Sequence, residues 1–422
     1  MMRVDLPKPL KSGQSYSFSI SWNFTLVNLK KIRARSGQEV LDDGNAIYSV
    51  AQWYPRMCAY TDVHGWRHRQ YLGGGEFTLE FGSFLVKITV PDDHIVASTG
   101  TLQNPEEVLT AEQRARLARA AEAKKPVLVV TREEADQNRK GRGKEKKTWI
   151  FHADMVRDFA FASSRSFVWD AMPSSGEGFA TLCMSYYPAE AMPLWSQYAT
   201  HATAQAIEVF SKHTVPYPWP VAISVNSPVG GMEYPMIHFT GARPEKDGTY
   251  SAGRKHGMIS VIIHEVGHNF FPMVINSDER EWIWMDEGFT TFVQNITEHE
   301  WSQAYPARRG APPASGRYMK SANQVPIMTS ADSLIQSSAN AYSKTAAGLI
   351  ILRETILGRE LFDFAFREYA RRWKFKRPMP ADFFRTMEDA SGVDLDWFFR
   401  GWFYTIDHND IAIAGLTRYT VD

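Results

Sequence analysis

The sequence predicts an α+β protein in which a β-rich part precedes a mostly helical part. Residues 14–100 include QSYSFSISWNF and EFTLEFGSFLVKITV, whose alternating or continuous apolar residues are typical of strands. Apolar residues recur at helical spacing in four later segments: 254–271, 286–300, 341–373 and 380–402. With 422 residues the chain is too long for one compact core, so two or three domains are expected.

Residues 1–175 are expected to form an N-terminal β-rich domain with a helical insertion near residues 106–147. The insertion begins with an Ala-, Arg- and Glu-rich segment in which Thr110 and Gln113 fit a helix capping box. The basic stretch NRKGRGKEKK at 138–147 is interpreted as a solvated loop rather than an anion-binding patch, because no aromatic residues alternate with its charges.

Residues 176–422 are expected to form the second domain. FATLCMSYY and PVAISVNS are predicted to be strands on either side of a long helix, and helices follow them. The stretch at 308–326 is expected to be an irregular surface connection. The chain therefore passes from mixed strands and helices into mostly helix.

The residues HEVGH at 264–268 contain two histidines four positions apart. On a helix, His264 and His268 lie on one face, one turn apart, where both can bind one metal ion. Eighteen residues separate His268 from Glu287, which lies in WMDEGF and adds an anionic ligand. This ligand set, with an open fourth position, is that of one catalytic Zn²⁺ per chain, and Glu265 is expected to be the general base.

The segment GGMEY at 230–234 follows a predicted strand and ends 30 residues before His264. Gly230 and Gly231 let the backbone approach a ligand closely. Glu233 would then offer a carboxylate at the edge of the cleft, which suits the α-ammonium group of a peptide. The alternative is a tight turn with a surface glutamate.

Tyr342 opens the predicted helix AYSKTAAGLIILRETIL, two positions before Lys344. A phenol above the metal can donate a hydrogen bond to the oxyanion that develops on a scissile carbonyl. The alternative is that Tyr342 only packs the start of a helix.

The composition argues against several other classes. Lys plus Arg equals Asp plus Glu, at 47 each, so no electrostatic feature favours nucleic acid or an anionic membrane as partner. No apolar run approaches a membrane span, and the N-terminus lacks the apolar region of a signal peptide. We expect a cytoplasmic protein if this N-terminus is genuine and possible export if the chain is a fragment.

Together, HEVGH, WMDEGF, GGMEY and Tyr342-x-Lys344 resemble the gluzincin aminopeptidases, the aminopeptidase N and leukotriene-A hydrolase family. The resemblance implies a saddle-like N-terminal β domain, incomplete here, followed by a thermolysin-like, mostly helical catalytic domain. Similarity is greatest to bacterial members. It implies a truncated chain that begins midway through the β domain and ends just past the catalytic domain.

The resemblance implies a role for each residue of these motifs. His264, His268 and Glu287 match the zinc ligands, Glu265 the general base, and Tyr342 the residue that stabilises the transition state.

For substrate binding, Glu233 matches the residue that binds the substrate N-terminus, and Gln52 lies where the β domain adds a second amine-binding residue. Val229 falls where the family lines the pocket for the first side chain. The resemblance gives these substrate-binding positions: Val229, Gly230, Gly231, Met232, Glu233 and Gln52. Two residues depart from the family pattern: Tyr234 replaces an asparagine, and Gln294 replaces a glutamate behind the metal ligands.

The expected function is that of a zinc-dependent aminopeptidase acting on peptides with a free N-terminus. Two alternatives stay open: another hydrolase on the same scaffold, such as an endopeptidase or an epoxide hydrolase, and a non-catalytic scaffold relative or inactive fragment. Glu233 argues against an endopeptidase. The intact ligands, Glu265 and Tyr342 argue against a non-catalytic relative.

Overall fold

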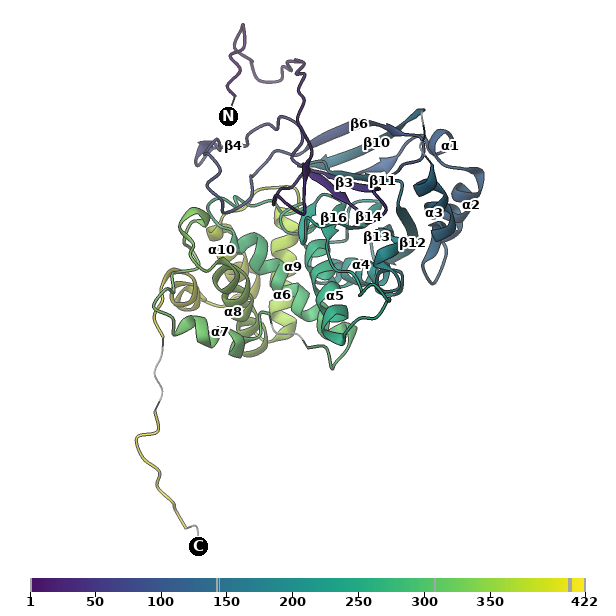
Figure 1. The fold of residues 1–422 in the computed structure, drawn as a ribbon. Coiled ribbons are helices and arrows are strands. Elements are labelled where there is room, and N and C mark those ends of the chain that lie inside the picture. Colours follow the sequence, from purple (N-terminus) through teal and green to yellow (C-terminus); the bar gives the residue numbers. More distant parts are fainter. Residues whose placement is uncertain (1, 142, 144, 307–308, 409–411, 421–422) are drawn as a thin grey trace.

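The protein was analysed as a computed structural model that describes residues 2–420, apart from 142, 144, 307–308 and 409–411. Figure 1 shows the strands in the upper part of the molecule and most of the later helices below them. This arrangement confirms the predicted α+β class. Among the described residues, no helix combines the length and the apolar character needed to cross a bilayer.

The first part of the chain forms two sheets and a hairpin. Five strands pair in the order β1 (Val27–Asn28), β2 (Gly37–Val40), β3 (Ala46–Val50), β11 (Phe161–Ser164) and β7 (Ile95–Ser98). Three strands pair in the order β6 (Gly82–Pro91), β10 (Lys146–Val156) and β8 (Thr101–Leu102). The hairpin consists of β4 (Tyr60–Thr61) and β5 (Gly65–Trp66).

The predicted helical insertion lies between β8 and β10. It contains α1 (Pro105–Val108), α2 (Ala111–Ala120) and α3 (Arg132–Lys140). The capping box is present at the start of α2, because Thr110 accepts a hydrogen bond from the backbone of Gln113 and the Gln113 side chain accepts one in return. Local sequence therefore fixes where this helix begins.

A third sheet supports the candidate site. Its six strands pair in the order β15 (Met232–Tyr234), β16 (Ile237–Thr240), β14 (Val221–Asn226), β13 (Phe179–Pro188), β12 (Phe167–Gly176) and β9 (Val127–Val130). β13, β14 and β16 are parallel, whereas β12 pairs antiparallel with β13 along its whole length. The sheet thus crosses residue 175, and the domain boundary placed there stays a prediction.

Helices cover this sheet and continue beyond it. Their bounds are α4 (Leu194–His213), α5 (Ala252–Gly267), α6 (Trp284–Trp301), α7 (Pro312–Met319), α8 (Thr345–Ile351), α9 (Arg359–Trp373), α10 (Pro380–Ser391) and α11 (Asp396–Phe399). Short helical turns, of 3₁₀ or π type, lie at η1 (Ala189–Ala191), η2 (Ala331–Ser333), η3 (Ser338–Lys344), η4 (Leu352–Ile356) and η5 (Arg400–Tyr404). α5 packs against both α4 and α6, and its buried residues include Ile259, Ile262 and Ile263.

Three expectations from the sequence are wrong or incomplete. The segment 14–24 forms no strand, and its side chains at Tyr16, Phe18 and Trp22 are exposed, because no described strand pairs with it. The stretch 308–326 contains α7, which begins with two prolines at positions that need no backbone donor. Residues 138–140 of the basic stretch belong to α3, while residues 142 and 144 lie outside the described residues.

His94 gives the β-rich part a defined response to pH. Its ring is 4% exposed and Nδ1 lies 2.8 Å from Ser163 Oγ. Burial, followed by the charge of Arg165, lowers the pKa of His94 to about 4. The unfolded chain, with a pKa of about 6.5, therefore binds more protons between pH 6.5 and pH 4, so stability is lost as pH falls through this window.

We expect the free energy of unfolding to fall by as much as about 3 kcal/mol between pH 7 and pH 4 through His94. Urea unfolding of the wild type and of His94→Asn at several pH values measures this term. The variant should show a shallower pH dependence over the window. Equal slopes for the two proteins would assign the acid sensitivity to other groups.

Candidate active site

α5 brings the two histidines together. Its first turn is capped by Ser251, whose hydroxyl accepts a hydrogen bond from Arg254 N, and it ends at Gly267. His264 and His268 therefore lie one turn apart at the end of the helix, both buried, with ring centres 4.6 Å apart.

Glu287, from the first turn of α6, completes a triangle of donor atoms. His264 Nε2 lies 3.1 Å from Glu287 Oε2 and 3.1 Å from His268 Nε2. His268 Nε2 lies 3.3 Å from Glu287 Oε2. In a tetrahedral zinc site with bonds of about 2.0–2.1 Å, neighbouring ligand atoms are about 3.4 Å apart. Both the donor types and their spacing thus fit Zn²⁺.

Residues behind the triangle orient its rings. His264 Nδ1 lies 2.9 Å from Gln294 Oε1, and the Gln294 amide nitrogen donates to Glu298 Oε1 at 2.7 Å. Because that amide nitrogen is engaged, the Gln294 oxygen accepts from Nδ1–H of His264, which leaves Nε2 as the metal-facing atom. Gln294 therefore performs the orienting task despite its departure from the family pattern.

Asp286 orients the second histidine. His268 Nδ1 lies 2.7 Å from Asp286 Oδ1 and 2.9 Å from the Phe271 carbonyl oxygen. The sequence reasoning missed Asp286, although it directly precedes Glu287 in WMDEGF.

Glu265 faces the GGMEY segment across a short gap. A Cβ added to Gly231 would lie 2.5 Å from Glu265 Oε1, so any side chain at this position would displace the Glu265 carboxylate. Glu265 is buried, and its Oε2 has no hydrogen-bond partner among the described residues. Burial, followed by the carboxylates of Glu233 and Glu287, raises the pKa of Glu265 against the opposing effect of His268. This carboxyl is therefore available for proton transfer.

Glu233 lies on β15, beside Glu265. Donor atoms of Glu233, Glu265 and His268 all lie within 4.8 Å of one another. Burial raises the pKa of Glu233 to about 7 against the opposing charge of His268, and the carboxylates of Glu287, Glu76 and Glu279 act in the same direction as burial. Buried carboxylates that lie this close together are stabilised by a cationic group placed between them.

Gln52 reaches the same region from the β-rich part. Its backbone has a positive φ of 51°, and its amide nitrogen donates to Glu76 Oε2 at 3.3 Å. Glu76 also pairs with Arg35 at 2.8 Å. Neither Glu76 nor Arg35 was predicted. Three glycines, at 73–75, precede Glu76 in the sequence, and nothing in this stretch indicates a carboxylate near the site.

Val229, Gly230 and Met232 lie close to Glu233 in the chain. Gly230 has a φ of 85°, and Val229 is partly buried with its N–H on Ser227 Oγ at 3.2 Å. Met232 is buried and pairs with Phe239 of β16.

Tyr342 lies against the triangle from the π-helical turn η3. Its hydroxyl donates to Glu287 Oε1 at 2.6 Å, and its ring stacks on His264 with centres 5.6 Å apart. Burial, followed by the charge of Glu287, raises the pKa of Tyr342, so the phenol keeps its proton. π-helical turns are frequent at functional sites.

A buried ion pair ties the β-rich part to this site. Arg157 Nη1 lies 2.7 Å from Glu279 Oε1 and donates to Asn276 Oδ1 at 2.9 Å. Donor atoms of Glu279, Asp286 and Glu233 lie within 4.8 Å of one another. These residues were also missed, because nothing in their local sequence indicates that they meet.

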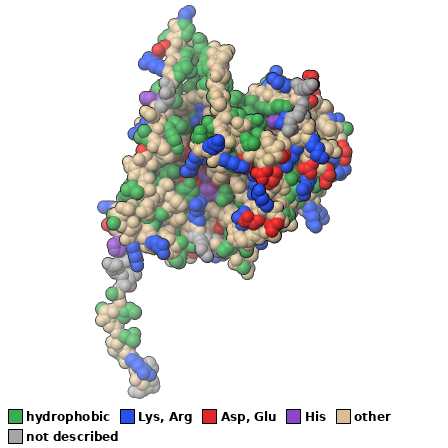
Figure 2. Space-filling view, viewed as in Figure 1, with side chains coloured by type: hydrophobic (Ala, Val, Ile, Leu, Met, Phe, Trp, Pro, Cys, Tyr) green, Lys and Arg blue, Asp and Glu red, His purple; other side chains and the backbone are tan. Residues whose placement is uncertain are grey.

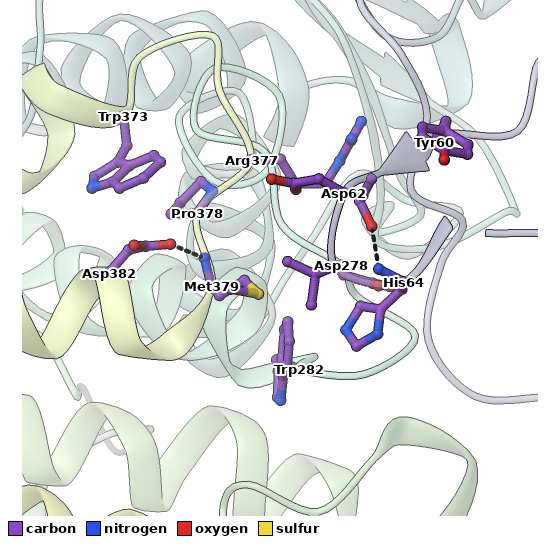
Figure 3. A pocket seen from close by; sticks show the side chains of 12 residues that line it. Tyr60, Asp62, His64, Asp278, Trp282, Trp373, Arg377, Pro378, Met379 and Asp382 are labelled. Atoms are coloured by element: carbon purple, nitrogen blue, oxygen red, sulfur yellow. Dashed lines mark hydrogen bonds between the residues drawn. The ribbon is translucent and has the colours of Figure 1, made fainter. Parts of the chain in front are cut away.

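A separate pocket of about 430 Å³ lies between the β4–β5 hairpin and the start of α10 (Figure 3). None of the predicted site residues lines it. Its lining residues are Tyr60, Thr61, Asp62, Val63, His64, Asp278, Trp282, Trp373, Arg377, Pro378, Met379 and Asp382.

Comparison with known proteins gives consistent matches. Residues 198–402 match the family model described as Peptidase family M1 domain. The chain is 22% identical over 219 residues to Aminopeptidase M1 of Arabidopsis thaliana, which covers 49% of this chain and 25% of that protein. It is 23% identical over 225 residues to Aminopeptidase N of Lactococcus lactis subsp. lactis, covering 49% and 26%. The chain thus spans about a quarter of the length of these curated relatives.

Solved structures share the fold. The M1 zinc metallopeptidase from Deinococcus radiodurans matches with a TM-score of 0.58 and 15% identity, covering 92% of this chain and 75% of that chain. A point mutant of the Deinococcus radiodurans protein, bound to a Tyr-Ser-Ala substrate, matches with a TM-score of 0.58 and 15% identity, covering 86% and 71%.

Proposed function

We propose that this protein, whose residues 198–402 match the model of the peptidase M1 family domain, is a zinc-dependent aminopeptidase that removes N-terminal residues from peptides. One observation carries the proposal: the Glu233 carboxylate lies within 4.8 Å of donor atoms of both Glu265 and His268. An anchor for a substrate ammonium group so close to the catalytic residues limits cleavage to the first peptide bond.

In this proposal His264, His268 and Glu287 hold one Zn²⁺. When bound, zinc supplies a Lewis acid that polarises a carbonyl group and makes water more acidic. Glu265 accepts the proton of the attacking water and returns it to the leaving amine. Tyr342 donates its hydrogen bond to the developing oxyanion.

Glu233 binds the α-ammonium group of the substrate, supported by Glu76 and Gln52. The oxygens of Glu76 are already engaged by Arg35 and Gln52, so Glu76 acts mainly through its charge. Val229, four residues before Glu233, would line the place of the first side chain of the substrate.

Metal analysis and one pair of peptides test the function. We expect one zinc per chain, and cleavage of a peptide with a free N-terminus but not of its N-acetylated form. Mass spectrometry of the products should show residues lost one at a time from the N-terminus. Internal cuts in both peptides would indicate an endopeptidase. No cleavage by the zinc-loaded protein would indicate a non-catalytic relative.

Tyr342→Phe should lower kcat by about 10²- to 10³-fold with little change in KM, because the hydrogen bond from Tyr342 to the oxyanion forms mainly in the transition state. Steady-state kinetics on a free peptide measures both constants. Tyr305→Phe is the matched control, since Tyr305 donates instead to the His256 carbonyl oxygen at 2.6 Å. A change confined to KM would make Tyr342 a ground-state binding residue.

A further inference from the structure

Arg309 lies in the connection between α6 and α7, and its backbone is fixed on two helices. Asn295 Nδ2, from α6, donates to the Arg309 carbonyl oxygen at 3.2 Å. Gly310 has a φ of 82°, and a Cβ added there would lie 2.9 Å from Ala346 Cβ of α8. These contacts determine where the Arg309 side chain begins.

The guanidinium group of Arg309 covers the ring of Tyr342. Its Cζ lies 4.8 Å from the ring centre of Tyr342, the residue whose hydroxyl contacts Glu287. A guanidinium group that stacks on an aromatic face keeps its in-plane N–H donors free for a second partner. Arg309 therefore has unused N–H groups close to the metal triangle, with only the Tyr342 side chain in between.

Arg309 is exposed, and no described carboxylate forms an ion pair with it. The other two arginines beside the site differ in this respect, because Arg35 pairs with Glu76 and Arg157 with Glu279. Figure 2 shows Lys and Arg side chains near the middle of the visible face, while most acidic side chains in view lie further to the right.

The site thus has carboxylates on one side and a positive charge on the other. The buried carboxylates Glu233 and Glu265 gather beside His268, whereas the free cation of Arg309 lies beside Tyr342, which stacks on His264. A substrate whose ammonium group binds at Glu233 would extend its other end away from these carboxylates. The arrangement suits a molecule with a positive and a negative end.

We propose that Arg309 binds a carboxylate of the substrate beyond the scissile bond, so that the protein prefers dipeptides and tripeptides with a free C-terminus. This inference rests on the proposed aminopeptidase function. An extended peptide spans at most about 3.6 Å per residue. Arg309 lies against Tyr342, which contacts Glu287, so the C-terminal carboxylate of a short peptide is the one that would lie nearest to its guanidinium group. An acidic side chain on the second residue of the substrate would also offer a carboxylate to Arg309.

Three matched substrates separate these sources. With X as the N-terminal residue that the wild type cleaves fastest, they are X-Gly-Gly, its C-terminal amide X-Gly-Gly-NH2, and X-Asp-Gly-NH2. We expect the wild type to cleave X-Gly-Gly with about 10- to 100-fold higher kcat/KM than the amide, as for a charge-assisted hydrogen bond. A preference for X-Asp-Gly-NH2 instead would assign the carboxylate to a side chain.

In Arg309→Gln, the ratio of acid to amide should fall to about one. The ratio is the readout because Arg309 also stacks on Tyr342, so its loss affects every substrate. Arg317→Gln is the matched control: Arg317 lies on α7, is exposed, and should keep the wild-type ratio. Equal cleavage of all three substrates by the wild type would overturn the role of Arg309 while leaving the aminopeptidase function intact. No cleavage of any of them would overturn both proposals.

Discussion

Glu265→Gln should retain zinc and fold normally, while kcat falls by about 10²- to 10⁴-fold, the usual contribution of a general acid–base group. Glutamine has the same shape as glutamate, so the close approach of Gly231 to this side chain is preserved. Its amide cannot accept the proton of the attacking water. Zinc content, thermal unfolding and steady-state kinetics on a free peptide measure the three properties separately.

Asp170→Asn is the matched control for this variant. Asp170 is 2% exposed and lies on β12, where it accepts a hydrogen bond from Tyr187 at 2.5 Å, outside the candidate site. It should keep near-normal kcat, which would show that losing a buried carboxylate is not enough to abolish activity. Near-normal turnover by Glu265→Gln would contradict the proposed mechanism.

Glu233→Ala should lower kcat/KM by about 10²- to 10³-fold for a peptide with a free N-terminus. Breaking one buried charge pair typically costs about 3–5 kcal/mol, because the remaining charge stays desolvated. kcat should fall as well, since this anchor positions the scissile bond. The Glu233→Gln variant keeps the size of the side chain and isolates the effect of its charge.

The N-acetylated peptide controls for this loss, because it has no ammonium group to bind. It should be a poor substrate from the outset and should change little in either variant. An equal loss for both peptides would instead assign Glu233 a structural role in β15. The Glu233→Gln variant should also unfold at higher temperature than the wild type, because it removes a buried carboxylate that opposes its neighbours without leaving a cavity.

The metal-binding part of the site was predictable because its geometry is local. The spacing of His264 and His268 fixes their relation on one helix, and Glu287 lies in a recognisable motif on the next. Gly231 of GGMEY lies beside Glu265, where an added Cβ would come 2.5 Å from Glu265 Oε1.

The surroundings were not predictable for a physical reason. Glu76, Arg157 and Arg309 come from loops or connections, where neither helical nor strand periodicity marks a side chain. They reach the site only through long-range packing. The strand predicted in the segment 14–24 is wrong for the opposite reason. Its apolar and polar residues alternate clearly, but a strand also needs a neighbouring strand to pair with.

The sheet that crosses residue 175 has a consequence for how the molecule unfolds. β12 (Phe167–Gly176) runs up to and just past this position, β13 follows it, and the two are paired along their whole length. The Arg157–Glu279 ion pair adds a second, fully buried link between the same two parts. Unfolding is cooperative when neither part can unfold without exposing buried groups of the other, and both links meet this condition. The β-rich part and the metal triangle should therefore melt in a single transition, not as two independent units.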